Sequence, residues 1–107
     1  MQTPHPGSTD RITVRIDPEL ENIVPIFLAN RRKDLETLRT ALAEQDFETI
    51  HVLGHRMKGD GGGYGFDKIT EIGGAMELAA ARRDHPAIER HTDQLEDYLA
   101  RVTVIYR

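Results

Sequence analysis

Apolar residues recur at roughly every third or fourth position along most of this chain, which is the spacing of the buried side of an amphipathic helix. The pattern predicts helices over about residues 17–44, from residue 46 into the glycines that follow Lys58, over 66–81 and over 84–102. Short links between helices favour antiparallel neighbours, so the chain predicts an all-α, up-down-up-down four-helix bundle. The predicted buried positions are Leu20, Ile23, Val24, Phe27, Leu35, Leu38, Leu42, Phe47, Ile50, Leu53, Met57, Phe66, Ile69, Ile72, Met76, Ala79 or Ala80, Ile88, Thr92, Leu95, Leu99 and Val102.

Aspartate and proline mark the starts of the helices. Asp17-Pro18 is a favourable beginning, because aspartate caps free backbone N–H groups and proline lacks the N–H that would be unsatisfied. Asp84 and Pro86 repeat this arrangement, and Asp46 is a further capping residue. Pro25 interrupts the first periodic segment, so we expect the first helix to be kinked or divided near Val24, with a short lead-in helix and a longer second part.

The two ends of the chain differ from the helical middle. Residues 1–10 are rich in proline and small polar residues and predict a mobile tail, which leaves residues 11–107 as one domain. Residues 11–16 and 101–107 alternate polar and apolar positions, as strands do. These two segments could pair as a small ribbon or pack on the end of the bundle. The pattern leaves open whether such pairing lies within one chain or between two.

Composition narrows the class of protein. The chain has 107 residues, a net charge of −4 and no cysteine, so disulfides and thiol chemistry are excluded. An acidic balance argues against a nucleic-acid binder, which needs a basic face. The chain contains no apolar run of the roughly 18 residues that a membrane span requires. We therefore expect a cytoplasmic protein that contacts neither nucleic acid nor membrane.

The densest polar chemistry lies between Phe47 and Phe66. On a helix, His55 points roughly 145° away from the apolar side and therefore toward solvent. Lys58 lies one turn later, and Gly59 beside it has no side chain to block an approaching partner. This combination predicts a docking surface around an exposed imidazole.

Metal binding is the first alternative for this segment. His51 and His55 are four positions apart and could reach one ion, with Glu48 as the nearest further ligand. The zinc-protease pattern fails, because Val52 follows the first histidine. The glycine run does not match a phosphate-binding loop, and no serine lies near either histidine. What remains is His55 as a nucleophile toward phosphorus, with Lys58 steadying the anionic group it receives.

This segment resembles the histidine phosphotransfer (HPt) domain. The family pattern H-x-[LM]-K-G reads here as His55 to Gly59, followed by Gly65-Phe66 and later by Met76-Glu77. The resemblance covers about residues 17–102. Asp60, where a small uncharged residue is usual, and the glycines 61–63 depart from the commonest pattern.

The resemblance implies that His55 accepts a phosphoryl group from a receiver-domain aspartate and returns it to another receiver. It implies Lys58 as the charge partner and Gly59 as the gap that admits the receiver. The expected partners are receiver domains of response regulators or hybrid sensor kinases, and the chain is expected to act as a monomeric carrier and not as an enzyme. We expect no cofactor or metal in the chain itself and Mg²⁺ on the receiver. The alternative is a helical interaction module that is not phosphorylated, with or without a metal at His51 and His55.

Overall fold

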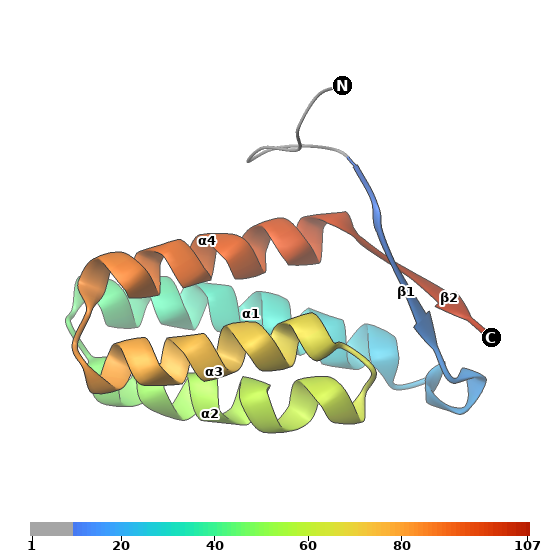
Figure 1. The fold of residues 1–107 in the computed structure, drawn as a ribbon, viewed down its shortest axis with the longest axis horizontal. Helices are drawn as coiled ribbons and strands as arrows, with labels where there is room; N and C mark the ends of the chain where they lie inside the picture. Colours follow the sequence, from blue (N-terminus) through green and yellow to red (C-terminus); the bar gives the residue numbers. More distant parts are fainter. Residues whose placement is uncertain (1–9) are drawn as a thin grey trace.

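The computed structural model of the protein describes residues 10–107, so the predicted tail falls outside the described residues except for Asp10. Four helices account for most of the chain and lie side by side in a bundle (Figure 1). The elements are the strand β1 (Ile12–Ile16), the 3-10 helix η1 (Pro18–Leu20), α1 (Val24–Ala43), α2 (Phe47–Gly63), α3 (Asp67–Ala81), α4 (His85–Arg101) and the strand β2 (Val102–Tyr106). The links 44–46, 64–66 and 82–84 are short, and consecutive helices run in opposite directions in Figure 1. None of the described helices is long and apolar enough to cross a membrane.

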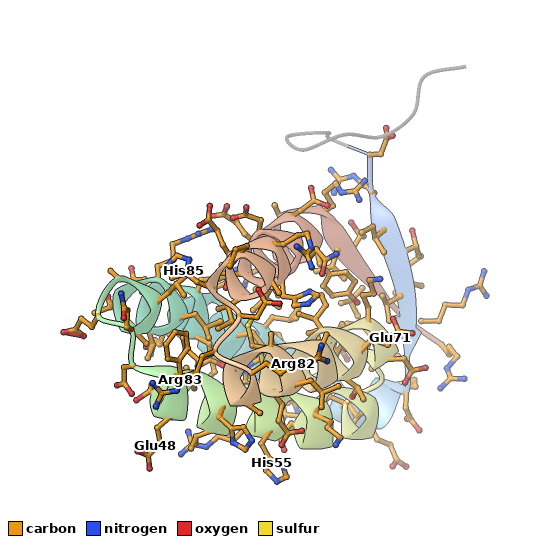
Figure 2. All side chains as sticks on the ribbon, turned by 60° about the vertical axis from the view of Figure 1, so that its left-hand side comes forward. Glu48, His55, Glu71, Arg82, Arg83 and His85 are labelled. Atoms are coloured by element: carbon orange, nitrogen blue, oxygen red, sulfur yellow. The ribbon has the colours of Figure 1, made fainter. Side chains whose placement is uncertain are left out.

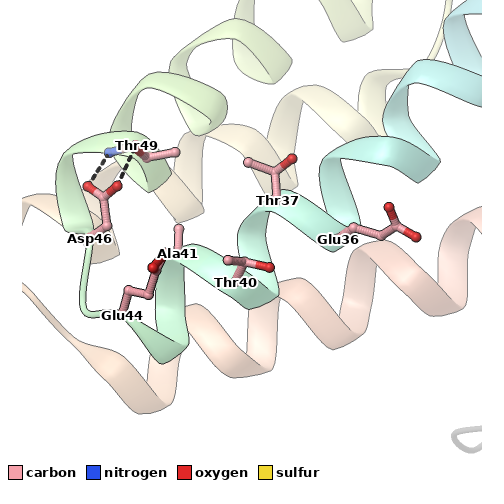
Figure 3. Close-up of a pocket in the computed structure, with 7 residues that line it drawn as sticks. All are labelled: Glu36, Thr37, Thr40, Ala41, Glu44, Asp46 and Thr49. Carbon is pink, nitrogen blue, oxygen red and sulfur yellow. Dashed lines mark hydrogen bonds between the residues drawn. The ribbon is translucent and has the colours of Figure 1, made fainter.

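Capping carboxylates begin the helices where the sequence predicts them. Asp46 accepts a hydrogen bond from the backbone N–H of Thr49 at 3.2 Å and another from the Thr49 hydroxyl at 2.6 Å (Figure 3). These bonds hold the pKa of the Asp46 carboxyl below its usual value. Asp84 accepts from the N–H of Ala87 at 3.2 Å in the same way. Each cap satisfies a donor that the first helical turn leaves without a partner.

The segment around Pro25 is built from separate elements. Asp17 caps η1, a turn follows, and α1 begins at Val24 with Pro25 in its first turn. Proline fits this position because the N–H it lacks has no helical acceptor there. The segment is therefore divided into a 3-10 helix and a distinct α-helix. Ile23, predicted to be buried, is 41% exposed because it lies in the turn before α1.

The core is formed by apolar side chains from all four helices together with Ile16 and Phe66. Phe27 stacks on Tyr64 with ring centroids 4.4 Å apart and on Phe66 at 5.5 Å, which joins α1 to the link between α2 and α3.

Val102, predicted to end the buried stripe of the last helix, instead begins β2 and is only partly buried.

Glycines bring α2 and α3 unusually close together. A Cβ atom on Gly54 would lie 2.7 Å from the backbone nitrogen of Glu77, and one on Gly73 would lie 2.5 Å from that of Lys58. Gly61 faces Thr70 at similarly short range. The sequence predicted a helix that runs from residue 46 into the glycines after Lys58, with Gly59 as the gap for a partner. The helix α2 continues to Gly63, and Gly54 and Gly61 are buried at its contact with α3.

The terminal segments pair with each other within the chain. β1 and β2 form a two-stranded parallel sheet in which Ile12 lies opposite Val102 and Ile16 opposite Tyr106. Parallel pairing is possible because the whole bundle connects the two strands, as parallel strands need a long crossover. Ile16 is almost fully buried, so the sheet is attached to the end of the bundle through its inner face.

Candidate functional site

His55 lies in the middle of α2 with its ring at the outer surface of the bundle (Figure 2). Its side chain is 71% exposed. The neighbouring turns of α2 bury Ile50, Leu53 and Met57, which fix the rotation of the helix about its axis. The burial of one apolar side therefore determines that this imidazole faces solvent.

Glu77 of α3 is the central partner of the site. Its Oε2 lies 2.7 Å from Nδ1 of His55, and its Oε1 lies 3.3 Å from Nζ of Lys58. The close contact of α2 with α3 at Gly54 brings the Glu77 backbone near enough for these bonds. Glu77 is the most enclosed of the three side chains, at 15% exposure. One carboxylate therefore holds both the histidine and the lysine.

These hydrogen bonds define the chemical state of the site. The bond to His55, and secondarily the Lys58 ammonium, hold the pKa of the Glu77 carboxyl below its usual value, against the opposing effect of partial desolvation. Glu77 is consequently ionised at neutral pH and can only accept hydrogen bonds. Nδ1 of His55 must then carry the proton, which leaves the lone pair of a neutral ring on the exposed Nε2.

Lys58 has a partner in the absence of a phosphoryl group. Its ammonium bonds Glu77, and its aliphatic stem passes over Gly74, where a Cβ atom would meet the stem at 3.7 Å. The side chain is nevertheless 54% exposed, and its long flexible stem has rotatable bonds that can turn the ammonium toward an anion on the ring. Gly59 follows it on the surface, with no atom within 4 Å of a Cβ placed there.

Asp60 faces the opposite side of α2 from Glu77. Its Oδ2 lies 3.9 Å from Nη1 of Arg31 on α1. Arg31 is well covered, bonds Asp34 at 2.8 Å and lies over the Phe27 ring at 4.9 Å. Burial raises the pKa of Asp34, and the Arg31 guanidinium only partly offsets this. The carboxylate that the sequence left unplaced is thus directed toward a fixed cation on α1.

His51 lies beside the site without belonging to its main hydrogen-bond network. Its Nε2 is 4.0 Å from Oε2 of Glu77, which is too far for a good hydrogen bond. Within residues 10–107, no group of three or more histidine, aspartate or glutamate side chains is arranged to hold a metal ion. Glu48, the third ligand considered for a metal, lies on the exposed first turn of α2.

The sequence reasoning placed His55, Lys58 and Gly59 on one surface, and the structure brings these residues together. Glu77 was recognised from the sequence as part of the family pattern, but no role in the site was predicted for it. The signal that could have identified Glu77 is the pairing of small residues in two helices, Gly54 with Gly73, which permits a close helix contact. That inference requires knowing how α2 and α3 are aligned, which helical periodicity alone does not supply.

A four-helix bundle with an exposed histidine hydrogen-bonded across two helices has the layout of a phosphoryl carrier. A comparison with protein-family models matches the Hpt domain over residues 22–103. The match covers most of the chain, and the protein belongs to the Hpt domain family. Comparisons with curated proteins and with solved structures gave no significant match. Membership implies histidine phosphotransfer in a two-component phosphorelay, with receiver domains as the class of partner.

Proposed function

We propose that this protein is a phosphorelay intermediate in which Nε2 of His55 carries the phosphoryl group between two receiver domains. The observation that supports this most directly is the 2.7 Å contact between Glu77 and Nδ1. It directs the lone pair of the imidazole outward, where a receiver aspartate can reach it. On this proposal the chain works as a cytoplasmic monomer with an antiparallel up-down-up-down bundle as its scaffold.

The transfer step forms one bond to phosphorus and breaks another. The Nε2 lone pair forms a bond to phosphorus while the bond from phosphorus to the receiver's aspartyl oxygen breaks, and the receiver regains its carboxylate. The ring retains its proton on Nδ1 and becomes positively charged as the N–P bond forms. The Glu77 carboxylate stabilises that charge at hydrogen-bond distance, in the way that buried aspartates support catalytic imidazoles.

Lys58 and Gly59 have separate roles in this proposal. The Lys58 ammonium moves from Glu77 to the phosphoryl oxygens, because the ring's positive charge then supplies a partner for Glu77. Gly59 leaves space for the receiver surface beside the ring. Most of the catalysis in phosphoryl transfer is positioning and charge neutralisation, and Mg²⁺ is proposed to come with the receiver.

The test is transfer of a labelled phosphoryl group from a panel of Mg²⁺-loaded, phosphorylated receiver domains. We expect an acid-labile, base-stable label on the protein that disappears in His55→Gln. His51→Gln is the matched control, since His51 is an exposed imidazole one turn away near the same carboxylate, and its label should persist. A label retained in His55→Gln, or lost only in His51→Gln, would overturn the assignment.

A further inference from the structure

The two-stranded sheet is an addition to the part of the chain that defines the family. The family match spans residues 22–103, whereas β1 and most of β2 lie outside it. Neither strand contributes to the site around His55. The sheet is therefore a separate feature, and its own surface needs an explanation.

The backbone of β1 has one free edge. The Ile16 carbonyl accepts from the N–H of Arg107 at 3.1 Å, and in a parallel ladder the residues of one strand alternate between the two edges. Val14 and Ile16 thus bond β2, while the N–H and C=O groups of Thr13 and Arg15 point to the other side. These groups have no hydrogen-bond partner among the described residues. Such an edge is a template for a further strand.

A hollow borders this edge. It has a volume of about 440 Å³ and is lined by residues 12–15 of β1 together with Gly65, Asp67, Lys68 and Tyr98, and by none from β2. The hollow is open to solvent along the strand, so an extended segment has room beside Thr13 and Arg15. Peptides commonly bind in this way, with main-chain bonds to an exposed strand supplying affinity.

The charge around the edge indicates what kind of segment fits. The protein as a whole carries a net charge of −4, but residues 11–16 and 101–107 contain four arginines and no acidic residue. Arg101 is paired with Asp97 of α4 at 3.0 Å, which leaves Arg11 and Arg15 as the basic residues of β1 and its start. Arg15 has no ion-pair partner among residues 10–107, whereas Lys68, which also lines the hollow, is paired with Glu71 at 3.7 Å, and Asp67 is the acidic residue of the lining. A second copy added at this edge would bring two sets of arginines together, which is unfavourable.

From the free edge, the hollow and the basic charge, we propose that β1 receives an extended acidic segment of a partner protein as a third strand of the sheet. Backbone bonds form to Thr13 and Arg15, and acidic side chains of the segment lie beside Arg11 and Arg15. This surface shares no residue with the site around His55, so a segment bound to β1 leaves that site accessible.

The test uses a labelled peptide of about seven residues that alternates glutamate and valine, long enough to span β1. We expect binding to the intact protein, with slower hydrogen exchange of the Thr13 and Arg15 amides. A peptide alternating lysine and valine, and an acidic peptide N-methylated along one edge, should both bind at least about tenfold more weakly. Binding should be unchanged in His55→Gln, which separates this proposal from that of phosphotransfer.

A charge variant completes the experiment. Arg15→Glu should weaken binding of the acidic peptide about tenfold, whereas Arg90→Glu, an equal change in net charge on the exposed side of α4, should have little effect. Absence of binding, equal binding of the lysine peptide, or protection elsewhere than at Thr13 and Arg15 would overturn the proposal. The proposal would also be overturned if, without any peptide, these amides became protected as the protein concentration rose and the mass of the protein doubled. The edge would then bind a second copy.

Discussion

Gly59→Ala should make the protein more stable and a poorer phosphoryl acceptor. Gly59 lies within α2, and a Cβ atom there meets nothing within 4 Å. Alanine in a helix interior is favoured over glycine by about 1 kcal/mol, and no contact opposes the change. For a domain of this size, that corresponds to a rise in melting temperature of about 4–8 °C. The added methyl group nevertheless occupies the space beside Lys58 that we assign to the receiver.

Gly54→Ala is the matched substitution in the same helix. It gains the same helix propensity, but its Cβ would lie 2.7 Å from the Glu77 nitrogen and 2.9 Å from the Gly73 carbonyl oxygen. Both are backbone atoms, so α2 and α3 must separate. Overpacking of this kind costs about 1–3 kcal/mol, which leaves a net loss of up to about 2 kcal/mol after the propensity gain of about 1 kcal/mol is subtracted.

Urea and thermal unfolding followed by circular dichroism measure both variants, and transfer from a phosphorylated receiver measures function. Gly59→Ala should unfold later than the wild type and accept phosphoryl more slowly, so stability and activity move in opposite directions. A lower melting temperature for Gly59→Ala would refute the inference that its surface is open. A melting temperature for Gly54→Ala raised as far as that of Gly59→Ala would refute the close contact between α2 and α3, because only the helix-propensity gain would then remain.

Three further outcomes follow from the hydrogen bonds of Glu77. Glu77→Gln should slow transfer by on the order of tenfold or more. It should also shift the ring ¹⁵N resonances of His55 toward a mixture of tautomers, which loss of packing alone would not cause. Because the folded-state pKa of Glu77 is lowered, its contribution to stability is present above its unfolded value of about 4.5 and is lost as the pH falls through the folded value. The difference in urea midpoint between wild type and Glu77→Gln should therefore be constant above about pH 5 and narrow progressively as the pH falls below the unfolded value of about 4.5, and a difference that grows in acid would contradict this sign. Lys58→Ala should slow transfer without lowering the melting temperature by more than a few degrees, since an exposed ion pair contributes little to stability, and an unchanged transfer rate would remove Lys58 from the mechanism.

Helical periodicity was sufficient to predict the four helices and most of the core, because each apolar stripe is a local property of its own segment. Its errors lie where a helix begins or ends. Ile23 and Val102 continue the apolar spacing, but the first lies in a turn and the second in a strand. At such positions the choice depends on contacts with distant parts of the chain. The pairing of β1 with β2 is of this kind, since parallel alignment of the two ends requires the complete bundle between them.

The site was predictable to the extent that it lies on one helix. His55, Lys58 and Gly59 share a surface by helical geometry, whereas Glu77 enters from α3 and depends on how closely two helices approach. Gly59 was expected to leave space beside His55, and a Cβ atom placed there meets nothing within 4 Å. Gly54 and Gly61 instead permit the close helix contact, and through it they place Glu77 beside the ring.

The carboxylates of Asp60 and Glu77 lie on opposite sides of α2. A carboxylate so close in sequence to the phosphoryl acceptor would repel the phosphoryl group if it faced the ring. It faces α1 instead, where Arg31 lies 3.9 Å away and is itself held by Asp34 and by the Phe27 ring. On the other side, Glu77 is matched by the His55 N–H and by Lys58. Asp60 and Glu77 thus each have a cation or proton donor of their own, so neither presents an unpaired negative charge to a phosphoryl group that approaches Nε2 of His55.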